Sequence, residues 1–315
     1  MKRILVTGAV GQIGSELTLA LRERFGNENV MATDIKVPEG KLLESGPYEC
    51  LDCTDIRLTG EVIQKHGPDT IYHLAALLSA VAEAKPQKAW EVNINGLYNI
   101  LEVARENNCA VFTPSSIGAF GPTTPRNNTP QDTIQRPNTM YGVTKVSGEI
   151  LCDYYFQRFG VDTRGVRYPG IISHETLPGG GTTDYAVDIF YEAIRNKSYT
   201  CFLNQGTRLD MMYMPDALKA AIDIMEADAS KFVHRNAFNV TAMSFAPEDL
   251  AAEIKKIIPE FSINYEVDPV RQAIADSWPD SMDDRAAREE WGWNPEYDLT
   301  AMTGDMIQAL TKKLT

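Results

Sequence analysis

A tyrosine and a lysine four residues apart carry the strongest chemical signal in this sequence. Tyr141 and Lys145 lie in a segment with helical periodicity, and residues four apart share one face of a helix. An ammonium group beside a phenol stabilises the phenolate and lowers the phenol pKa from about 10 towards neutrality. Such a phenolate is a general base near neutral pH. We predict that Tyr141 is a catalytic base and that Lys145 tunes it.

A serine at the end of a predicted strand completes this set. Ser116 closes the run Thr113-Pro114-Ser115-Ser116, which comes 25 residues before the tyrosine. A hydroxyl at a strand end is placed to hold the reacting oxygen of a substrate beside the phenol. Ser115 is the neighbouring candidate, although a serine there is also an ordinary turn residue. The expected catalytic residues are therefore Tyr141, Lys145 and Ser116.

The chain opens with a glycine-rich turn between a short apolar strand and an amphipathic helix. The turn is Gly8-Ala9-Val10-Gly11-Gln12-Ile13-Gly14, after the strand 3–7 and at the start of a helix that runs to Phe25. Glycine permits the tight turn, a close backbone approach to a pyrophosphate and close packing of helix on strand. The free N–H groups at the helix start then face the phosphates. This context predicts a dinucleotide site.

An acidic residue at the end of the second predicted strand indicates which dinucleotide binds. Asp34 follows Gly14 by 20 residues, where a carboxylate accepts both ribose hydroxyls of an adenosine and repels a 2′-phosphate. We therefore predict NAD rather than NADP, and Lys36 weakens that preference slightly. The expected cofactor contacts are Gly8, Val10, Gly11, Gln12, Ile13, Gly14, Asp34, Ile35, Lys36, Asp52, Cys53, Leu74, Ala75, Ala76, Tyr141, Lys145 and Ile171.

Two other patterns favour ordinary structural roles. His73 ends a predicted strand and is tempting as a base, but a histidine there is more often packed and hydrogen-bonded. Cys50 and Cys53 have the C-x-x-C spacing of a redox or metal pair. No second such pair occurs, and no histidine stands at zinc-finger spacing, so a chance match is favoured. We expect no metal.

Composition excludes several classes of function. The chain has 315 residues, of which 43% are hydrophobic and 23% charged, and this is ordinary for a globular protein. Its net charge of −13 makes nucleic acid and membrane surfaces poor partners. The longest apolar runs fall short of the roughly 18–20 residues of a membrane span. No secretory leader is recognisable at the start, so we expect a cytoplasmic protein.

Strands that alternate with helices predict an α/β fold, a Rossmann-like, doubly wound parallel sheet. The expected strands are 3–7, 30–33, 49–51, 70–74, 110–114 and 162–168, and the expected helices between them include 56–66, 86–107 and 141–159. Segment 36–47 looks like a loop, 173–184 like a mobile loop, and 200–215 irregular. We predict an NAD-binding lobe of residues 1–170, to which 210–243 returns. A smaller, discontinuous substrate lobe would comprise 171–200 and 244–315.

These motifs resemble the extended branch of the short-chain dehydrogenase/reductase superfamily over nearly the whole chain. Several segments are similar to the short-chain-type L-threonine 3-dehydrogenases. They are the runs 115–122 (SSIGAFGP), 167–173 (RYPGIIS), 178–186 (PGGGTTDYA), 211–214 (MMYM) and 268–279 (DPVRQAIADSWP). The glycine-threonine run and the Arg-Gln-Ala-Ile-Ala run are more specific than the superfamily motifs.

The resemblance implies NAD-dependent oxidation of L-threonine at its β-carbon to 2-amino-3-oxobutyrate. The protein would supply position and electrostatics, while the cofactor carries the redox chemistry. Ser79 and the glycine-threonine run would bind the substrate carboxylate, and Trp278 would close over the methyl group. The expected substrate contacts are Ser79, Ser116, Tyr141, Gly181, Thr182, Thr183 and Trp278.

Two alternatives remain open from the sequence. A nucleotide-sugar epimerase or dehydratase shares the first 170 residues, but it needs basic residues for a diphosphate, and no obvious Arg/Lys cluster occurs in the second lobe. A non-catalytic NAD-binding regulator typically loses the tyrosine or the lysine, and both are present here. Extended relatives commonly pair through the helices expected at 86–107 and 141–159. Both helices carry surplus apolar residues, so we expect a homodimer.

Overall fold

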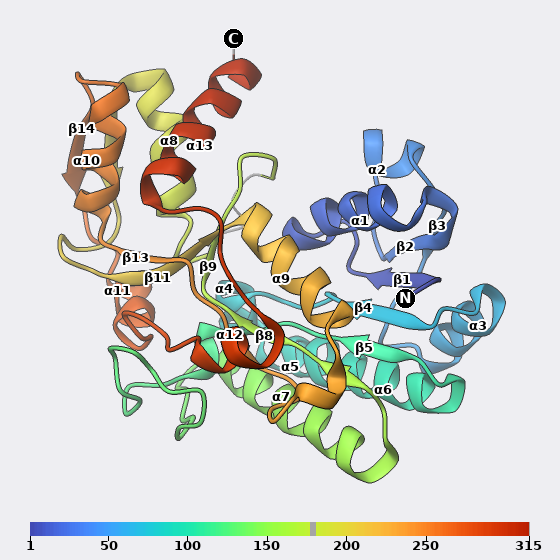
Figure 1. Ribbon diagram of the computed structural model, residues 1–315. Coiled ribbons are helices and arrows are strands. Elements are labelled where there is room, and N and C mark those ends of the chain that lie inside the picture. Colours follow the sequence, from blue (N-terminus) through green and yellow to red (C-terminus); the bar gives the residue numbers. More distant parts are fainter. Residues whose placement is uncertain (177–180, 315) are drawn as a thin grey trace.

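Six parallel strands form the central sheet, in the order β3-β2-β1-β4-β5-β7. The computed structural model in Figure 1 describes residues 1–176 and 181–314, so the expected loop 173–184 lies partly outside the described residues. The strands are β1 (Ile4–Thr7), β2 (Val30–Asp34), β3 (Tyr48–Cys50), β4 (Thr70–His73), β5 (Ala110–Phe112) and β7 (Thr163–Arg164). The prediction of a Rossmann-like parallel sheet is confirmed.

Helices cover both faces of this sheet. Helices α1 (Gln12–Phe25) and α9 (Met214–Glu226) share an apolar cluster with Ile4 and Val6 of β1. Leu5, whose side chain alternates to the other face, packs in a different cluster with α3 (Ile56–His66), α6 (Gly96–Asn107) and α7 (Met140–Phe159). Figure 1 shows α1 and α9 above the sheet and α6 and α7 below it. Three short helices complete this part, α2 (Gly40–Glu44), α4 (Ser79–Ala84) and α5 (Pro86–Trp90).

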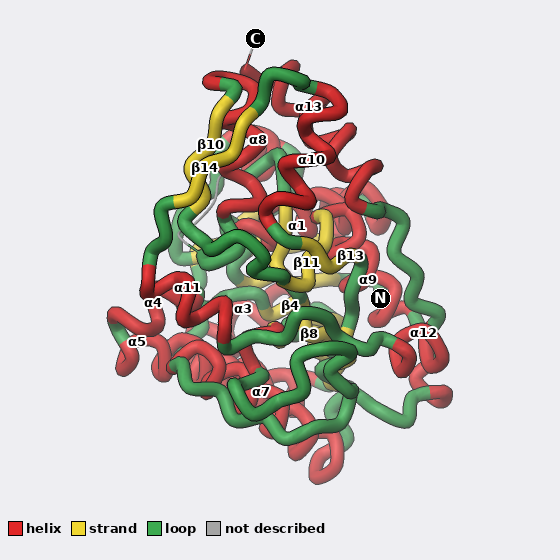
Figure 2. Tube along the Cα trace, turned by 90° about the vertical axis from the view of Figure 1, so that its left-hand side faces the viewer, coloured by secondary structure: helices red, strands yellow, loops and turns green. Residues whose placement is uncertain are grey.

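The rest of the chain builds smaller sheets and a second apolar core. Strands β6 (Ser115–Ser116), β8 (Val166–Tyr168) and β12 (Phe238–Asn239) form one sheet, and β9 (Gly170–Ile172), β11 (Leu209–Tyr213) and β13 (Met243–Phe245) another. Strand β10 (Ser198–Cys201) pairs with β14 (Ser262–Tyr265). The helices are α8 (Tyr185–Asn196), α10 (Pro247–Ile257), α11 (Pro269–Asp276), α12 (Arg285–Trp291) and α13 (Leu299–Leu314). Figure 2 shows α10, α13, β10 and β14 at one end of the molecule and α7 towards the other.

The segment 200–215 is more regular than expected. It contains the buried strand β11, which pairs with β9 and β13, and α9 begins directly after it with Pro215 in the first turn. Asp210 interrupts the apolar run of β11 and hides the strand in the sequence. Its carboxylate is buried and accepts bonds from the Thr241 hydroxyl and from the backbone N–H of Met282 at 2.7 Å.

Other expected elements are present with altered boundaries. The predicted strand 162–168 is divided at Gly165 into β7 and β8, and a Cβ at that glycine would lie 2.2 Å from the carbonyl oxygen of Thr113. The loop expected at 36–47 contains the short helix α2. The helix expected at 86–107 contains one π-helical segment, Glu91–Asn95, between α5 and α6. Helix α7 begins where the Thr139 hydroxyl accepts the backbone N–H of Gly142 at 3.1 Å.

Within residues 1–176 and 181–314, no helix is both long enough and apolar enough to cross a membrane. The same residues contain no group of three or more His, Cys, Asp or Glu side chains arranged to hold a metal ion. Cys50 is exposed and Cys53 is buried, and both are free thiols. Burial raises the pKa of Cys53 to about 12, so its thiol stays protonated at neutral pH.

Candidate active site

The glycine turn lies at the point where the order of the central sheet reverses, between β1 and β4. Gly8 has φ +71°, and a Cβ there would lie 2.6 Å from the backbone nitrogen of Ala75. A Cβ at Gly14 would lie 2.1 Å from the carbonyl oxygen of Gly8. The turn therefore needs glycine at both positions, and no side chain in the described part of the chain caps the start of α1. This cradle fits the pyrophosphate of a dinucleotide.

Two backbone N–H groups orient the carboxylate of Asp34, the residue predicted to bind an adenosine ribose. One carboxylate oxygen accepts the N–H of Val10 at 3.0 Å, and the other accepts the N–H of Lys36 at 2.9 Å. A cavity of about 350 Å³ adjoins it. Its lining includes every residue expected at the adenosine end, namely Gly8, Val10, Gly11, Asp34, Ile35, Lys36, Asp52, Cys53, Leu74, Ala75 and Ala76. The donor set and the glycine cradle fit NAD.

A second cavity, of about 220 Å³, continues from the same glycine turn towards the other core. Gly8, Gly11, Leu74 and Ala76 line both cavities, so the two are neighbours. The remaining predicted site residues all line this second one, namely Gln12, Ile13, Gly14, Ser79, Ser116, Tyr141, Lys145, Ile171, Gly181, Thr182, Thr183 and Trp278. Tertiary structure thus brings together residues from opposite ends of the chain, and we call this space the reaction cavity.

Ser116 and Ser115 have different partners. Ser116 stays beside the reaction cavity, where its Oγ accepts the backbone N–H of Gly118 at 3.1 Å. The Ser115 hydroxyl instead donates to the buried carboxylate of Glu149. Ser115 therefore lacks a free hydroxyl proton for a substrate, and Ser116 is the better candidate. Gly118 leaves room for the ring of Tyr141 next to Ser116, because a Cβ there would lie 3.1 Å from Cδ1 of Tyr141.

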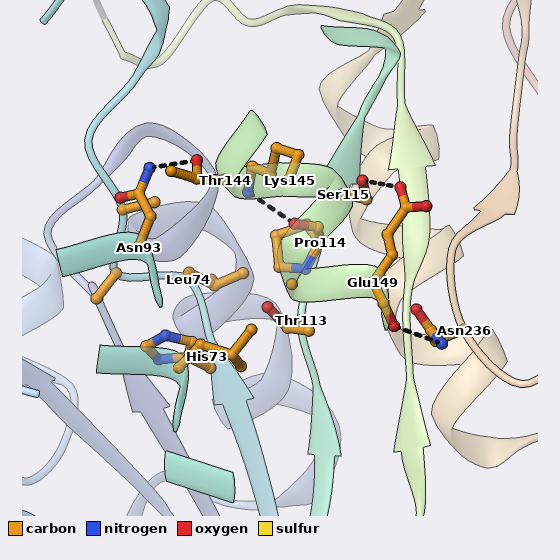
Figure 3. Close-up of a pocket in the computed structure, with 14 residues that line it drawn as sticks. His73, Leu74, Asn93, Thr113, Pro114, Ser115, Thr144, Lys145, Glu149 and Asn236 are labelled. Atoms are coloured by element: carbon orange, nitrogen blue, oxygen red, sulfur yellow. Dashed lines mark hydrogen bonds between the residues drawn. The ribbon is translucent and has the colours of Figure 1, made fainter. Parts of the chain in front are cut away.

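Lys145 lies on the same face of α7 as Tyr141. Its Nζ is 5.5 Å from the centre of the Tyr141 ring and donates to the carbonyl oxygen of Pro114 at 2.8 Å. Figure 3 shows this bond and, beside it, the bond from Asn93 to Thr144 at 3.1 Å. Asn93 also pairs with both backbone groups of Leu77, at 2.7 and 3.1 Å.

Asn93 was not recognised in the sequence. It lies in the π-helical segment, and nothing in the helical pattern marks that irregularity. Asp184 was also missed. It lines the reaction cavity and accepts the N–H of Gly181 at 2.6 Å. The sequence did offer a signal for Asp184, because it directly follows the two predicted substrate threonines at the start of a helix.

His73 is a packed residue, as the sequence favoured. It is buried at the end of β4, and its Nδ1 lies 2.7 Å from the hydroxyl oxygen of Thr7. Burial lowers the pKa of His73 to about 3, and the Lys145 ammonium adds to that shift. A fully buried imidazole with so low a pKa is too weakly basic to be a good candidate for the general base.

Comparisons with known proteins find relatives that match most or nearly all of this chain. Residues 4–241 match the family model described as the NAD dependent epimerase/dehydratase family. An uncharacterized epimerase/dehydratase of Staphylococcus saprophyticus is 57% identical over 99% of this chain and 98% of its own length. An L-threonine dehydrogenase of Clostridium difficile is 61% identical with a TM-score of 0.98, over 99% of this chain and 98% of that one. A GalE-like L-threonine dehydrogenase of Cupriavidus necator, in its holo form, is 51% identical with a TM-score of 0.95, over 98% of this chain and 99% of that one.

These matches span nearly the whole chain and confirm the resemblance to the extended short-chain dehydrogenase/reductases. The family is NAD-dependent, so NAD is the cofactor, as the sequence predicted and as the cradle at Gly8 and Asp34 fits. From the glycine turn, the Tyr141–Lys145 pair and these comparisons together, the chain belongs to the NAD-dependent epimerase/dehydratase family.

Proposed function

We propose that this protein oxidises L-threonine at its β-carbon to 2-amino-3-oxobutyrate. The observation that carries the proposal is the lining of the reaction cavity. Lys145 is the only cation and Asp184 the only carboxylate among the described residues that line it, beside the hydroxyls of Ser79, Ser116, Thr182 and Thr183. A small zwitterion with one hydroxyl group suits such a cavity. The 61% identity to an L-threonine dehydrogenase supports the same substrate.

Ser116, Tyr141 and Lys145 have separate roles in the proposed reaction. Ser116 donates a hydrogen bond to the substrate hydroxyl oxygen, and the phenolate of Tyr141 accepts the hydroxyl proton as the C=O bond forms. Lys145 stabilises the phenolate, and it leaves Pro114 to hold the cofactor ribose. When bound, NAD supplies the acceptor for the hydride that leaves the β-carbon.

The other wall of the cavity orients the amino acid. The N–H groups and hydroxyls of Thr182 and Thr183, together with Ser79, receive the substrate carboxylate. Asp184 receives the ammonium group. Trp278 is 93% buried and packs over the methyl group. These contacts place the β-hydrogen, rather than another hydrogen, towards the cofactor.

A nucleotide-sugar substrate is the principal alternative within the family. Its diphosphate needs several cations, and the described lining of the reaction cavity offers Lys145 alone.

The test of the proposed function is NADH formation by the purified protein on threonine, allo-threonine, serine and UDP-glucose. Turnover of threonine above the other three supports the proposal, and epimerisation of UDP-glucose without threonine oxidation refutes it. NAD binding without turnover of any of them would support the regulator instead.

We further propose that two copies pair through α6 and α7. Both helices expose apolar side chains to solvent, namely Tyr98 at 46%, Ile150 at 63% and Tyr154 at 52%. Exposed apolar area of this kind on neighbouring helices marks an association surface.

A further inference from the structure

Behind the reaction cavity lies a small space that the proposed reaction does not use. Its volume is about 30 Å³, and Figure 3 shows the side chains around it, with Lys145 bonded to Pro114 and Ser115 bonded to Glu149. Glu149 is the only carboxylate among the described residues that line this space. Its side chain is 6% exposed, and it follows Lys145 by four residues on α7. A buried charge at this position requires partners.

Three segments of the chain supply those partners. The Ser115 hydroxyl donates from β6 to one oxygen of Glu149, and the Gln135 amide donates to the other at 2.8 Å. Arg167 on β8 donates to both oxygens, from Nε at 3.0 Å and from Nη2 at 2.8 Å. This two-point contact fixes the orientation of the carboxylate as well as its charge.

Arg167 is equally constrained. Its side chain is 8% exposed, and its third nitrogen donates to the carbonyl oxygen of Gln131 at 2.8 Å and to the side chain of Asn239 at 3.1 Å. The guanidinium lies 5.1 Å from the ring centre of Phe120. Neither member of the pair can change rotamer without losing several buried hydrogen bonds.

The pair joins the two elements that carry the catalytic set. Helix α7 holds Tyr141 and Lys145, which precede Glu149 by two turns and one turn on the same face. Strand β6 holds Ser116 next to the bonded Ser115, and β6 pairs with β8 so that Ser115 lies opposite Arg167. Glu149 thus links α7 by hydrogen bonds to the end of β6, where the Ser116 hydroxyl lies.

We propose that Glu149 and Arg167 are a positioning pair that sets the Ser116 hydroxyl against the Tyr141–Lys145 face of α7. The proposal rests on the proposed function only for the identity of the substrate. Neither side chain lines the reaction cavity, so neither contacts substrate. A displacement of about 1 Å between reacting groups costs up to about 100-fold in rate. The pair therefore affects turnover through Ser116, not through binding.

The first test compares substitutions that keep or remove the two-point contact. Arg167→Lys keeps the positive charge but replaces the guanidinium fork with one ammonium nitrogen. Arg167→Met removes both the charge and the fork. We expect kcat to fall about 10-fold in Arg167→Lys and further in Arg167→Met, with KM for threonine and Kd for NAD within about 3-fold of wild type. Glu149→Gln should match Arg167→Lys. A kcat of Arg167→Lys equal to that of wild type would overturn the proposal, because the positive charge alone would then be enough to position Ser116.

A matched control separates positioning from loss of stability. The side chain of Arg164 on β7 is as buried as that of Arg167, with 8% of it exposed, and it pairs with Asp162. It donates hydrogen bonds to backbone carbonyl oxygens at the end of α9 rather than to α7. Arg164→Met should lower Tm as Arg167→Met does and leave kcat of the folded enzyme unchanged. Equal kcat losses in the two variants would mean that the Glu149 pair acts only through stability.

A double-mutant cycle tests the route of the effect. If Glu149 acts through Ser116, then Glu149→Gln costs less than about 3-fold in an enzyme that already carries Ser116→Ala. Multiplicative losses would show that Glu149 acts independently of Ser116 and would overturn the proposal. Because Glu149→Gln replaces the carboxylate with an amide of nearly the same shape, the cycle uses folded proteins even where Arg167→Met is unstable.

The activity of the wild-type protein on threonine distinguishes a failure of the proposed function from a failure of the positioning role of Glu149 and Arg167. If wild type does not oxidise threonine, the proposed function fails. The same variant ratios are then measured on the substrate of the panel that wild type does convert, because the Tyr141–Lys145–Ser116 set serves any secondary alcohol.

Discussion

Gly118 faces Tyr141 so closely that a side chain on Gly118 would displace the phenol ring. A Cβ on Gly118 would lie 3.1 Å from Cδ1 and 3.2 Å from Cε1 of Tyr141, and 3.6 Å from Oγ of Ser116. This glycine therefore determines how closely the ring of Tyr141, the proposed base, approaches the hydroxyl of Ser116. Its role depends on the absence of a side chain.

Gly118→Ala should lower kcat about 10-fold while NAD affinity changes less than 3-fold, because the Tyr141 ring must move by a few tenths of an ångström. Steady-state kinetics and a fluorescence titration with NADH measure both. Gly60→Ala, on α3 with nothing within 4 Å of the added Cβ, is the control. It should keep full activity and gain about 0.4–1 kcal/mol of stability. Unchanged kcat in Gly118→Ala would contradict the role given to this contact.

Tyr141→Phe should lose at least about 100-fold in kcat and still bind NAD, because removal of a general base costs about 10²–10⁴-fold. Tyr191→Phe is a suitable control, since the buried Tyr191 hydroxyl has no hydrogen-bond partner among the described residues. A Tyr141→Phe enzyme with more than about a tenth of the wild-type rate would exclude Tyr141 as the base.

Asp34→Ala should narrow the preference for NAD over NADP. The change removes the acceptor of the ribose hydroxyls and the repulsion of a 2′-phosphate, so kcat/KM with NAD should fall about 10-fold and kcat/KM with NADP should not. Asp228→Ala, an exposed acid on another part of the surface, controls for the change in net charge. Equal efficiency of wild type with NAD and NADP would refute the role of Asp34.

His73 should make the free energy of unfolding fall as the pH is lowered. Its pKa is about 3 when folded and about 6.5 when unfolded, so protons bind the unfolded chain more readily. The stability contributed by neutral His73 is complete above pH 6.5 and is lost progressively from there towards pH 3. Urea titrations between pH 8 and pH 5 measure the slope. His73→Asn should flatten it, because an amide does not titrate, and an unchanged slope would exclude His73 as its source.

Ile150→Glu should convert the proposed dimer into a monomer without changing the fold. A charge in the centre of an apolar interface leaves a buried carboxylate without a partner and costs several kcal/mol. Light scattering at micromolar concentration reports the mass, and circular dichroism reports the fold. Val233→Glu, at an apolar position outside α6 and α7 with 83% exposure, is the matched control. A wild type that is already monomeric would refute the pairing.

Local patterns made much of the site predictable. The strand, glycine turn and α1 follow one another directly, so their geometry depends on neighbouring residues, and α1 spans Gln12–Phe25 as expected. Asp34 ends β2, and Tyr141 and Lys145 share a face of α7 because helical spacing alone places them there. Each of these statements needs only hydrophobic periodicity and the length of one βαβ unit.

The sequence by itself determined which residue types are present and which short elements carry them. Only tertiary structure decided that Trp278 and Thr182 meet Ser79 in one cavity, because such contacts depend on how two cores pack. It also gave the two neighbouring serines different partners, since the Ser115 hydroxyl donates to a carboxylate 34 residues away. The Glu149–Arg167 pair had no signal in the sequence. A buried ion pair forms only when a helix and a strand have already excluded water between them.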